Sequence, residues 1–200
     1  MSPEEMWLAM MNETPEEKQL ISKVWEFANL FDDMLFKPDT ISSSLTMVDV
    51  EGKKMQMSLP EELELFTYDN YKFRVEVLED ADGYYQNDEK VLCIDSGSLN
   101  CDSVILHEMI HLHEFVVNEL SLYFHDALVF ALYWSLKEKI NNLDDLIMRH
   151  AHVMNGADIS ILGGTHDILF LLKSFDLDLK MGYELGTVFG YDKKEEIKDR

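Results

Sequence analysis

The stretch VILHEMIHLHE, residues 104–114, decides how the second half of the chain folds. It places His107 and His111 four residues apart, with Glu108 directly after the first histidine. Its other side chains are mostly apolar and recur almost all the way round a helical repeat, which predicts a buried helix. Burying two imidazoles and a carboxylate is costly unless they are paired or bind a metal ion. The pattern therefore favours a metal site on this helix.

The spacing of the two histidines suits zinc. On a helix, residues i and i+4 lie on one face about one turn apart, so His107 and His111 can direct their imidazoles at one metal ion. A catalytic zinc ion takes three protein ligands and a water, whose pKa it lowers toward about 7. Glu108 can then accept the proton of that water and return it to a leaving amine. We predict Zn2+ as the cofactor, His107 and His111 as ligands, and Glu108 as the catalytic residue.

The composition bounds the class of protein. The chain has 200 residues, of which 46% are hydrophobic, and this predicts one domain with its own core. Seventeen basic and 39 acidic residues give a net charge of −22, which repels phosphate backbones and anionic membranes, so neither nucleic acid nor a membrane is an expected partner. The first residues lack the basic start and apolar stretch of a signal peptide, and no long apolar run follows. We expect a soluble, cytoplasmic protein, and the sequence carries no signal for an oligomeric state.

Hydrophobic periodicity divides the single domain, residues 1–200, into three parts. Residues 1–40 are expected to form a helical cover, residues 41–96 a sheet, and residues 102–190 a helical part that carries the site. The sheet should be small, mostly antiparallel and of about four strands, with a hairpin turning near residues 51–53 and a turn in DADGYYQNDEK. The prediction is an α+β fold with this sheet packed on the HExxH helix and further helices at both ends. The helices after the sheet are expected at about 102–117, 122–140, 142–154, 165–175 and 180–189.

These residues also resemble a known family. VILHEMIHLHE, preceded by the turn and strand of GYYQNDEKVLCIDSGS, resembles the active-site unit of HExxH zinc metallopeptidases, the zincins. The resemblance covers about residues 71–140, and only the five-residue motif is specific. It implies a zincin-like fold with His107 and His111 as ligands and Glu108 as catalytic carboxylate. It also implies an antiparallel edge strand beside the motif helix, which binds extended substrate by strand addition; KVLCID or YKFRVEV would take that place.

The third zinc ligand has to come from outside the motif. Metzincins place a glycine and a histidine where this chain has Glu114 and Val117, which excludes that subgroup. Gluzincins take a glutamate from the next helix, and Glu138 lacks the aspartate that usually follows it. Thirteen residues separate His111 from His125, which is enough for the chain to turn and start a second helix beside the first. We therefore predict His125 as the third ligand, and in this spacing the chain resembles SprT-like peptidases, although Asp126 replaces their glycine.

Other residues remain as alternatives near the site. Asp126 is the alternative ligand, or it orients a neighbouring group as a hydrogen-bond partner. His166 lies just inside a helix start, where it could stabilise an oxyanion or serve a capping or surface role. Glu114 lies two turns from His107, too far to ligate together with it, so a hydrogen-bond partner or an exposed helix end is expected. His113, His150 and His152 are not expected to be ligands.

Three functions are compatible with this sequence. The first is a zinc-dependent metallopeptidase that acts on a peptide or protein substrate. The second is a catalytically inactive module with a zincin fold that binds a metal or a protein. The third is a helical interaction protein in which the motif arose by chance.

Overall fold

The computed structural model of the chain describes residues 13–31, 44–48, 54–58, 71–120, 122–151 and 166–190. The described residues form an α+β structure, as predicted, in which most helices follow the strands. The first half contains α2 (Pro15–Ala28), β1 (Ser44–Val48), β2 (Lys54–Ser58), β3 (Lys72–Glu76), β4 (Gly83–Gln86) and β5 (Val91–Asp95). The second half contains α3 (Asp102–Leu120), α4 (Leu122–Lys137), α5 (Leu143–Ala151) and α6 (Ile168–Met181).

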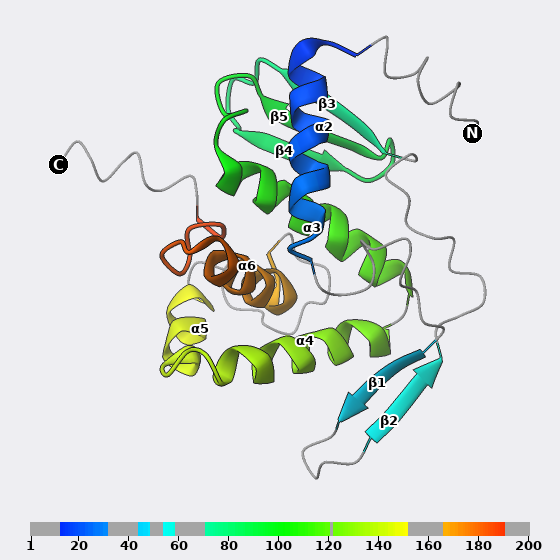
Figure 1. Cartoon of the computed structure of the whole chain (residues 1–200), viewed down its shortest axis with the longest axis vertical. Coiled ribbons are helices and arrows are strands. Elements are labelled where there is room, and N and C mark those ends of the chain that lie inside the picture. The colour runs from blue at the N-terminus through cyan, green and yellow to red at the C-terminus, as the bar shows by residue number, and fades with distance from the viewer. Residues whose placement is uncertain are drawn as a thin grey trace, which may run out of the picture.

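The strands form two separate sheets (Figure 1). Strands β1 and β2 pair antiparallel, with Ser44 opposite Ser58, which confirms the predicted hairpin. The other sheet has the order β3-β5-β4, in which β3 is parallel to β5 and β4 is antiparallel to it. The structure therefore has a mixed three-stranded sheet and a hairpin where one four-stranded, mostly antiparallel sheet was expected. GYYQ, expected to be part of a turn, is strand β4, and this extra reversal of the chain leaves β3 parallel to β5.

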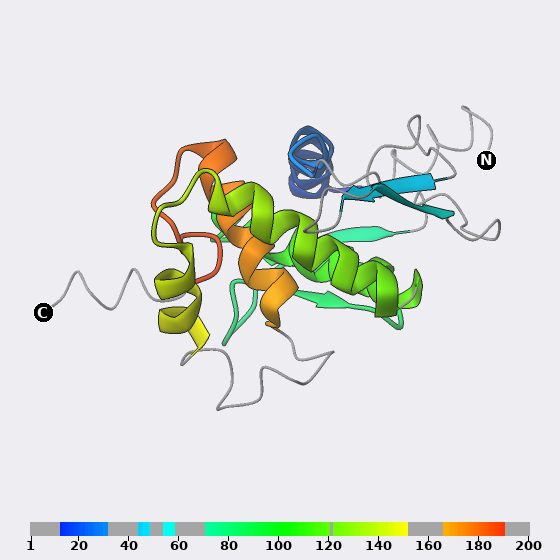
Figure 2. The same ribbon diagram turned by 90° about the horizontal axis from the view of Figure 1, so that it is seen from below.

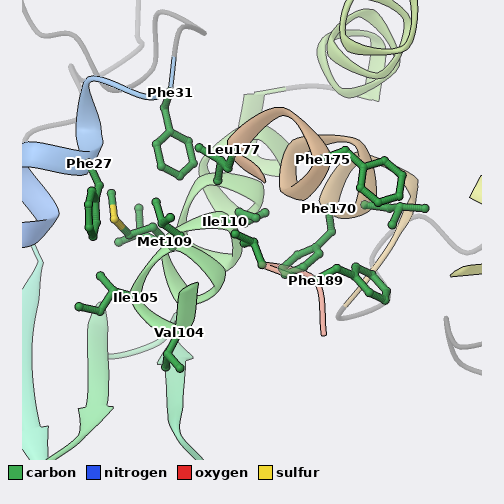
Figure 3. Close-up of a cluster of buried hydrophobic side chains, with 14 of the residues drawn as sticks. Phe27, Phe31, Val104, Ile105, Met109, Ile110, Phe170, Phe175, Leu177 and Phe189 are labelled. Atoms are coloured by element: carbon green, nitrogen blue, oxygen red, sulfur yellow. The ribbon is translucent and has the colours of Figure 1, made fainter. Parts of the chain in front are cut away.

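The three-stranded sheet packs on α2 and α3 (Figure 1). Helix α2 lies against β3, and its start is fixed by Thr14, whose side chain accepts the Glu17 N–H while the Glu17 carboxylate accepts the Thr14 N–H. Helix α3 lies against β4 and β5. Figure 3 shows Phe27 of α2 beside Met109 of α3, in the core that both helices share with the sheet. This packing fixes α3, the helix that carries the HExxH motif.

The side of α3 away from α2 faces α6, and α6 in turn contacts α4 (Figures 1 and 2). Helix α6 is buried along most of its length, from Leu169 to Asp178. It ends at Gly182, which caps the helix in the left-handed conformation with φ 70°. The chain from there to Gly190 forms turns, so the helix expected at about 180–189 is not present.

The remaining helices match their predicted positions with small shifts of their ends. Helix α3 continues to Leu120 and α4 stops at Lys137, while α5 is described only to Ala151. Within the described ranges no helix combines the length and the apolar character that a membrane crossing requires.

Candidate metal centre

Helix α3 places the two motif histidines on one face. The ring centroids of His107 and His111 lie 5.0 Å apart, as expected for residues one helical turn apart. The His107 residue is 5% exposed and the His111 side chain 16% exposed. Both imidazoles therefore lie in the interior, on the side of α3 that faces α6.

The start of α6 brings a third histidine to this face. His166 precedes Asp167, the N-cap of α6, and its ring centroid lies 5.0 Å from those of His107 and His111. The Nε2 atoms of His166 and His107 are 3.1 Å apart. Phe170, in the first turn of α6, packs against all three rings at centroid distances of 4.7, 4.7 and 4.6 Å. The three imidazoles thus surround one aromatic side chain and converge on one point.

The three histidines could hold a metal ion. One ligand nitrogen from each of His107, His111 and His166 lies within 4.8 Å of the other two. Around a tetrahedral zinc ion with Zn–N bonds of about 2.0–2.1 Å, neighbouring ligand atoms are about 3.3 Å apart. The Nε2–Nε2 distance of 3.1 Å between His107 and His166 is close to that value. Imidazole nitrogens suit zinc, copper, iron or nickel, so the donor set fits a transition metal better than calcium or magnesium.

Burial keeps these imidazoles in the form that binds metal. It lowers the pKa of His107 from 6.5 to about 3. Burial, with a smaller contribution from His107, lowers the pKa of His111 to about 2, and burial also lowers the pKa of His166. All three are therefore neutral at physiological pH, and a metal ion does not have to displace a proton from the ligand nitrogens.

The turn region after α6 orients His107. The carbonyl oxygen of Val188 accepts a hydrogen bond from Nδ1 of His107 at 2.9 Å, which leaves Nε2 directed at His166. Asp178 holds this part of the chain, because its carboxylate accepts the N–H groups of Gly186 at 2.6 Å and of Val188 at 3.0 Å. Such contacts to the second ring nitrogen fix the tautomer of a metal-binding histidine.

Glu114 lies beside His111, one turn further along α3. One carboxylate oxygen, Oε2, is 3.8 Å from Nδ1 of His111, and the residue is 6% exposed. The other oxygen, Oε1, is buried and has no hydrogen-bond partner among the residues that the structure describes. Burial raises the pKa of Glu114 well above its usual value, and the neighbouring Asp167 raises it further. The expectation of an exposed helix end is therefore wrong for Glu114, and its contact with His111 is longer than a hydrogen bond.

Glu108 is on the flank of α3 that faces the sheet. The residue is 2% exposed, and its Cγ lies next to Gly83 of β4. A Cβ at Gly83 would come within 2.9 Å of this Cγ and 3.0 Å of the Cys93 carbonyl oxygen, so a side chain at position 83 would displace Glu108 or the strand. Because β4 is an edge strand and antiparallel to its neighbour, it has the position expected for KVLCID or YKFRVEV. KVLCID instead forms the central strand β5. YKFRVEV forms β3, the other edge strand, which is parallel to β5 and packs against α2.

His125, predicted as the third ligand, is not in the histidine cluster. Its Nε2 is 2.9 Å from the carboxylate of Asp167, and its Nδ1 is 3.5 Å from that of Asp126. Both ring nitrogens therefore face carboxylates, and neither is left for the metal. Asp126, the alternative ligand, has a side chain that is 67% exposed and also lies outside the cluster. His166 is the third histidine of the cluster because the start of α6, and not the start of α4, lies against the face of α3 that carries His107 and His111.

The other polar residues considered from the sequence lie elsewhere. His113 is fully buried, with its ring centroid 5.6 Å from that of Phe31. His150 contacts the Leu146 carbonyl oxygen within α5 through Nδ1, at 2.8 Å. Glu138 is exposed just after α4, and His152 lies outside the described residues. The sequence does mark a helix start near His166, through Gly163 and Gly164, but this signal does not distinguish His166 from His125 as a ligand.

Comparisons of the chain with family models, with curated proteins and with solved structures give no match.

Proposed function

We propose that the chain is a zinc-dependent metallopeptidase of zincin-like architecture, with His107, His111 and His166 as the zinc ligands. The observation that carries this proposal is the convergence of three imidazoles, one buried and two partly buried, two of them from an HExxH helix. Three protein ligands with one open position are typical of catalytic zinc, whereas structural zinc sites usually have four. The three donors found among the described residues therefore favour a catalytic role over a purely structural one.

Each side chain has a distinct task in this proposal. The three histidines hold the ion, and Val188 and Glu114 orient the rings of His107 and His111 from behind. When bound, zinc would act as a Lewis acid and lower the pKa of a bound water toward about 7. Glu108 accepts the proton of the attacking water and delivers it to the leaving amine. The proposed substrate is a peptide or protein segment in an extended conformation.

The position of β4 supports an extended substrate. This strand forms one edge of the sheet and lies against α3, next to the residue proposed as the base. A peptide that adds to a sheet edge is held by its main-chain groups, so its scissile bond is placed largely independently of its sequence. Edge binding at β4 would bring that bond to the flank of α3 that carries Glu108.

The alternative function is a metal-binding module without peptidase activity. The burial of Glu108 against Gly83 is the observation that favours it, because a base has to reach the water whose proton it accepts. In this alternative Glu108 would support the packing of α3 on β4, and the zinc ion would stabilise the contact between α3 and α6.

Glu108→Gln separates the two functions. The zinc-loaded wild type and the variant are incubated with a peptide library derived from a whole proteome, and cleavage products are identified by mass spectrometry. The peptidase predicts cleavage by the wild type and a rate lower by about 10²- to 10⁴-fold in Glu108→Gln. Zinc content should be the same in both proteins. The control variant Glu138→Gln changes an exposed glutamate just after α4 and should cleave peptides like the wild type. A zinc-loaded wild type that cleaves no peptide would favour the module.

A further inference from the structure

Three buried polar side chains from three different helices meet beside the histidine cluster. Glu114 comes from α3, Asp167 caps α6, and His125 comes from α4. Glu114 is 6% exposed and His125 is 3% exposed, while the Asp167 side chain is 11% exposed. Burying such groups among apolar side chains costs stability, so their presence together needs a compensating role.

Asp167 is held from two sides. Its Oδ2 is 2.9 Å from Nε2 of His125, and its Oδ1 accepts the N–H of Phe170 at 3.0 Å in the first turn of α6. His166 is the residue directly before Asp167. Fixing Asp167 therefore also fixes the backbone from which the His166 imidazole projects, and through Phe170 the ring that all three histidines contact. His125 thus acts on the cluster through the start of α6.

Glu114 is the link to the other side of the cluster. It lies 3.8 Å from Nδ1 of His111 and is close enough to Asp167 for that carboxyl to raise its pKa. Oε1 of Glu114 is buried without a hydrogen-bond partner among the described residues, and burying an unpaired polar atom costs stability. A carboxyl kept at such a cost next to a ligand histidine is explained if it holds that histidine in its metal-binding orientation.

We infer that Glu114, Asp167 and His125 form a positioning chain that orients His111 and His166 toward a shared metal ion. The inference rests on the proposed metal centre, but not on peptidase activity. It also gives His125, expected from the sequence to be a ligand, a different role: it holds Asp167, and Asp167 holds the segment that carries His166. The three side chains of this positioning chain link α3, α4 and α6, the three helices around the site.

The test measures metal binding and folding stability separately. Zinc affinity is measured by competition with a chromophoric chelator, and the visible spectrum of the cobalt-substituted protein reports the ligand geometry. Glu114→Leu should bind zinc about 10- to 100-fold more weakly than the wild type, the usual cost of losing a partner of a ligand histidine. The urea midpoint of the same variant, measured without metal, should stay the same or rise, because a buried carboxyl is replaced by an apolar side chain. A side chain needed only for folding would lower the midpoint instead.

His125 is tested with two substitutions and one control. His125→Ala should weaken zinc binding about 10- to 100-fold while the cobalt spectrum keeps its intensity, and His125→Gln, which can still donate to Asp167, should recover part of the loss. Asp126→Asn, at the exposed neighbour of the other ring nitrogen, should bind zinc like the wild type. If Glu114→Leu and His125→Ala bind zinc as tightly as the wild type, the positioning chain is disproved and the metal centre stands. If His125→Ala loses the cobalt spectrum as His107→Ala does, His125 is a ligand and the inference is wrong. A wild type that binds neither metal overturns the proposed function itself.

Discussion

The two sides of helix α3 carry different kinds of buried side chain. Toward α2 and the sheet, α3 presents mostly apolar side chains such as Ile105 and Met109, which pack into a continuous core (Figure 3). Two buried polar side chains, Glu108 beside β4 and His113 beside Phe31, also lie on this side. Toward α6 it presents His107, His111 and Glu114, which are nearly as well buried but polar. The side toward α2 and the sheet stabilises the fold mainly through apolar burial, whereas the side toward α6 costs stability until its polar groups find partners. The side of α3 that faces α6 therefore carries the polar groups that could hold a metal ion.

Zinc should therefore stabilise the protein by acting on the polar side. At a free zinc concentration of 100 times Kd, linkage predicts an increase in the free energy of unfolding of about 2.7 kcal/mol. Urea denaturation with zinc and with a chelator measures this difference. His166→Ala, which removes one member of the cluster, should abolish the increase, while the metal-free variant should unfold much like the metal-free wild type. An equal increase in His166→Ala would mean that zinc binds somewhere else.

The segment that holds the ring of His107 can be weakened by a substitution at Asp178, without changing any histidine. Asp178→Asn weakens the acceptor of the Gly186 and Val188 N–H groups, and we expect a loss of about 1–3 kcal/mol in the free energy of unfolding. Because Val188 then holds His107 less firmly, zinc affinity should fall as well. Chemical denaturation and chelator competition on the same samples check both effects. A stability loss with unchanged zinc affinity would show that the loop does not orient His107.

The polar side should also make stability depend on pH. The folded-state pKa values of His107, about 3, and His111, about 2, lie below the unfolded value of about 6.5. Below pH 6.5 the unfolded chain takes up protons that the folded chain does not, so the metal-free protein loses stability as the pH falls. Each of the two histidines contributes up to about 1.4 kcal/mol per pH unit between about pH 6 and 4. Urea midpoints across this range should show a shallower slope in His107→Gln, and an unchanged slope would contradict the low pKa.

The smallest effect is expected on the apolar side. Thr14→Ala removes the N-cap of α2 and should cost about 1 kcal/mol in the free energy of unfolding. Because Thr14 caps the start of α2, and α6 is contacted at Leu30 beyond the other end of that helix, zinc affinity should not change. Thermal or urea denaturation, with zinc titration as the second readout, tests the independence of the two sides. A fall in zinc affinity in this variant would show that the apolar side also positions the site.

The local features of the molecule could be predicted from the sequence because they depend on nearby residues. The buried character of α3 follows from its apolar periodicity, the start of α2 from Thr14 and Pro15, and the hairpin from its alternating strands. Strand β4 was missed because Gly83 and the polar residues around GYYQ are typical of a turn. What makes GYYQ a strand is its pairing with β5, which lies later in the chain.

The third member of the cluster could not be predicted because it depends on how distant elements pack. His166 and His107 are 59 residues apart in sequence, and both His125 and His166 follow helix-start signals beside an aspartate. Local sequence treats these two histidine–aspartate pairs alike. The structure separates them: His166 faces two neutral imidazoles, whereas His125 faces carboxylates on both ring nitrogens. Only the packing of α6 between α3 and α4 decides which histidine is available to a metal.

The most direct test of the metal centre is a crystal structure of the zinc-soaked protein with anomalous diffraction measured on both sides of the zinc absorption edge. We predict one strong zinc peak with ring nitrogens of His107, His111 and His166 at about 2.0–2.1 Å, and His125 still on Asp167. A zinc ion bound through His125, or the absence of zinc between His107 and His111 in a protein exposed to it, would contradict the account.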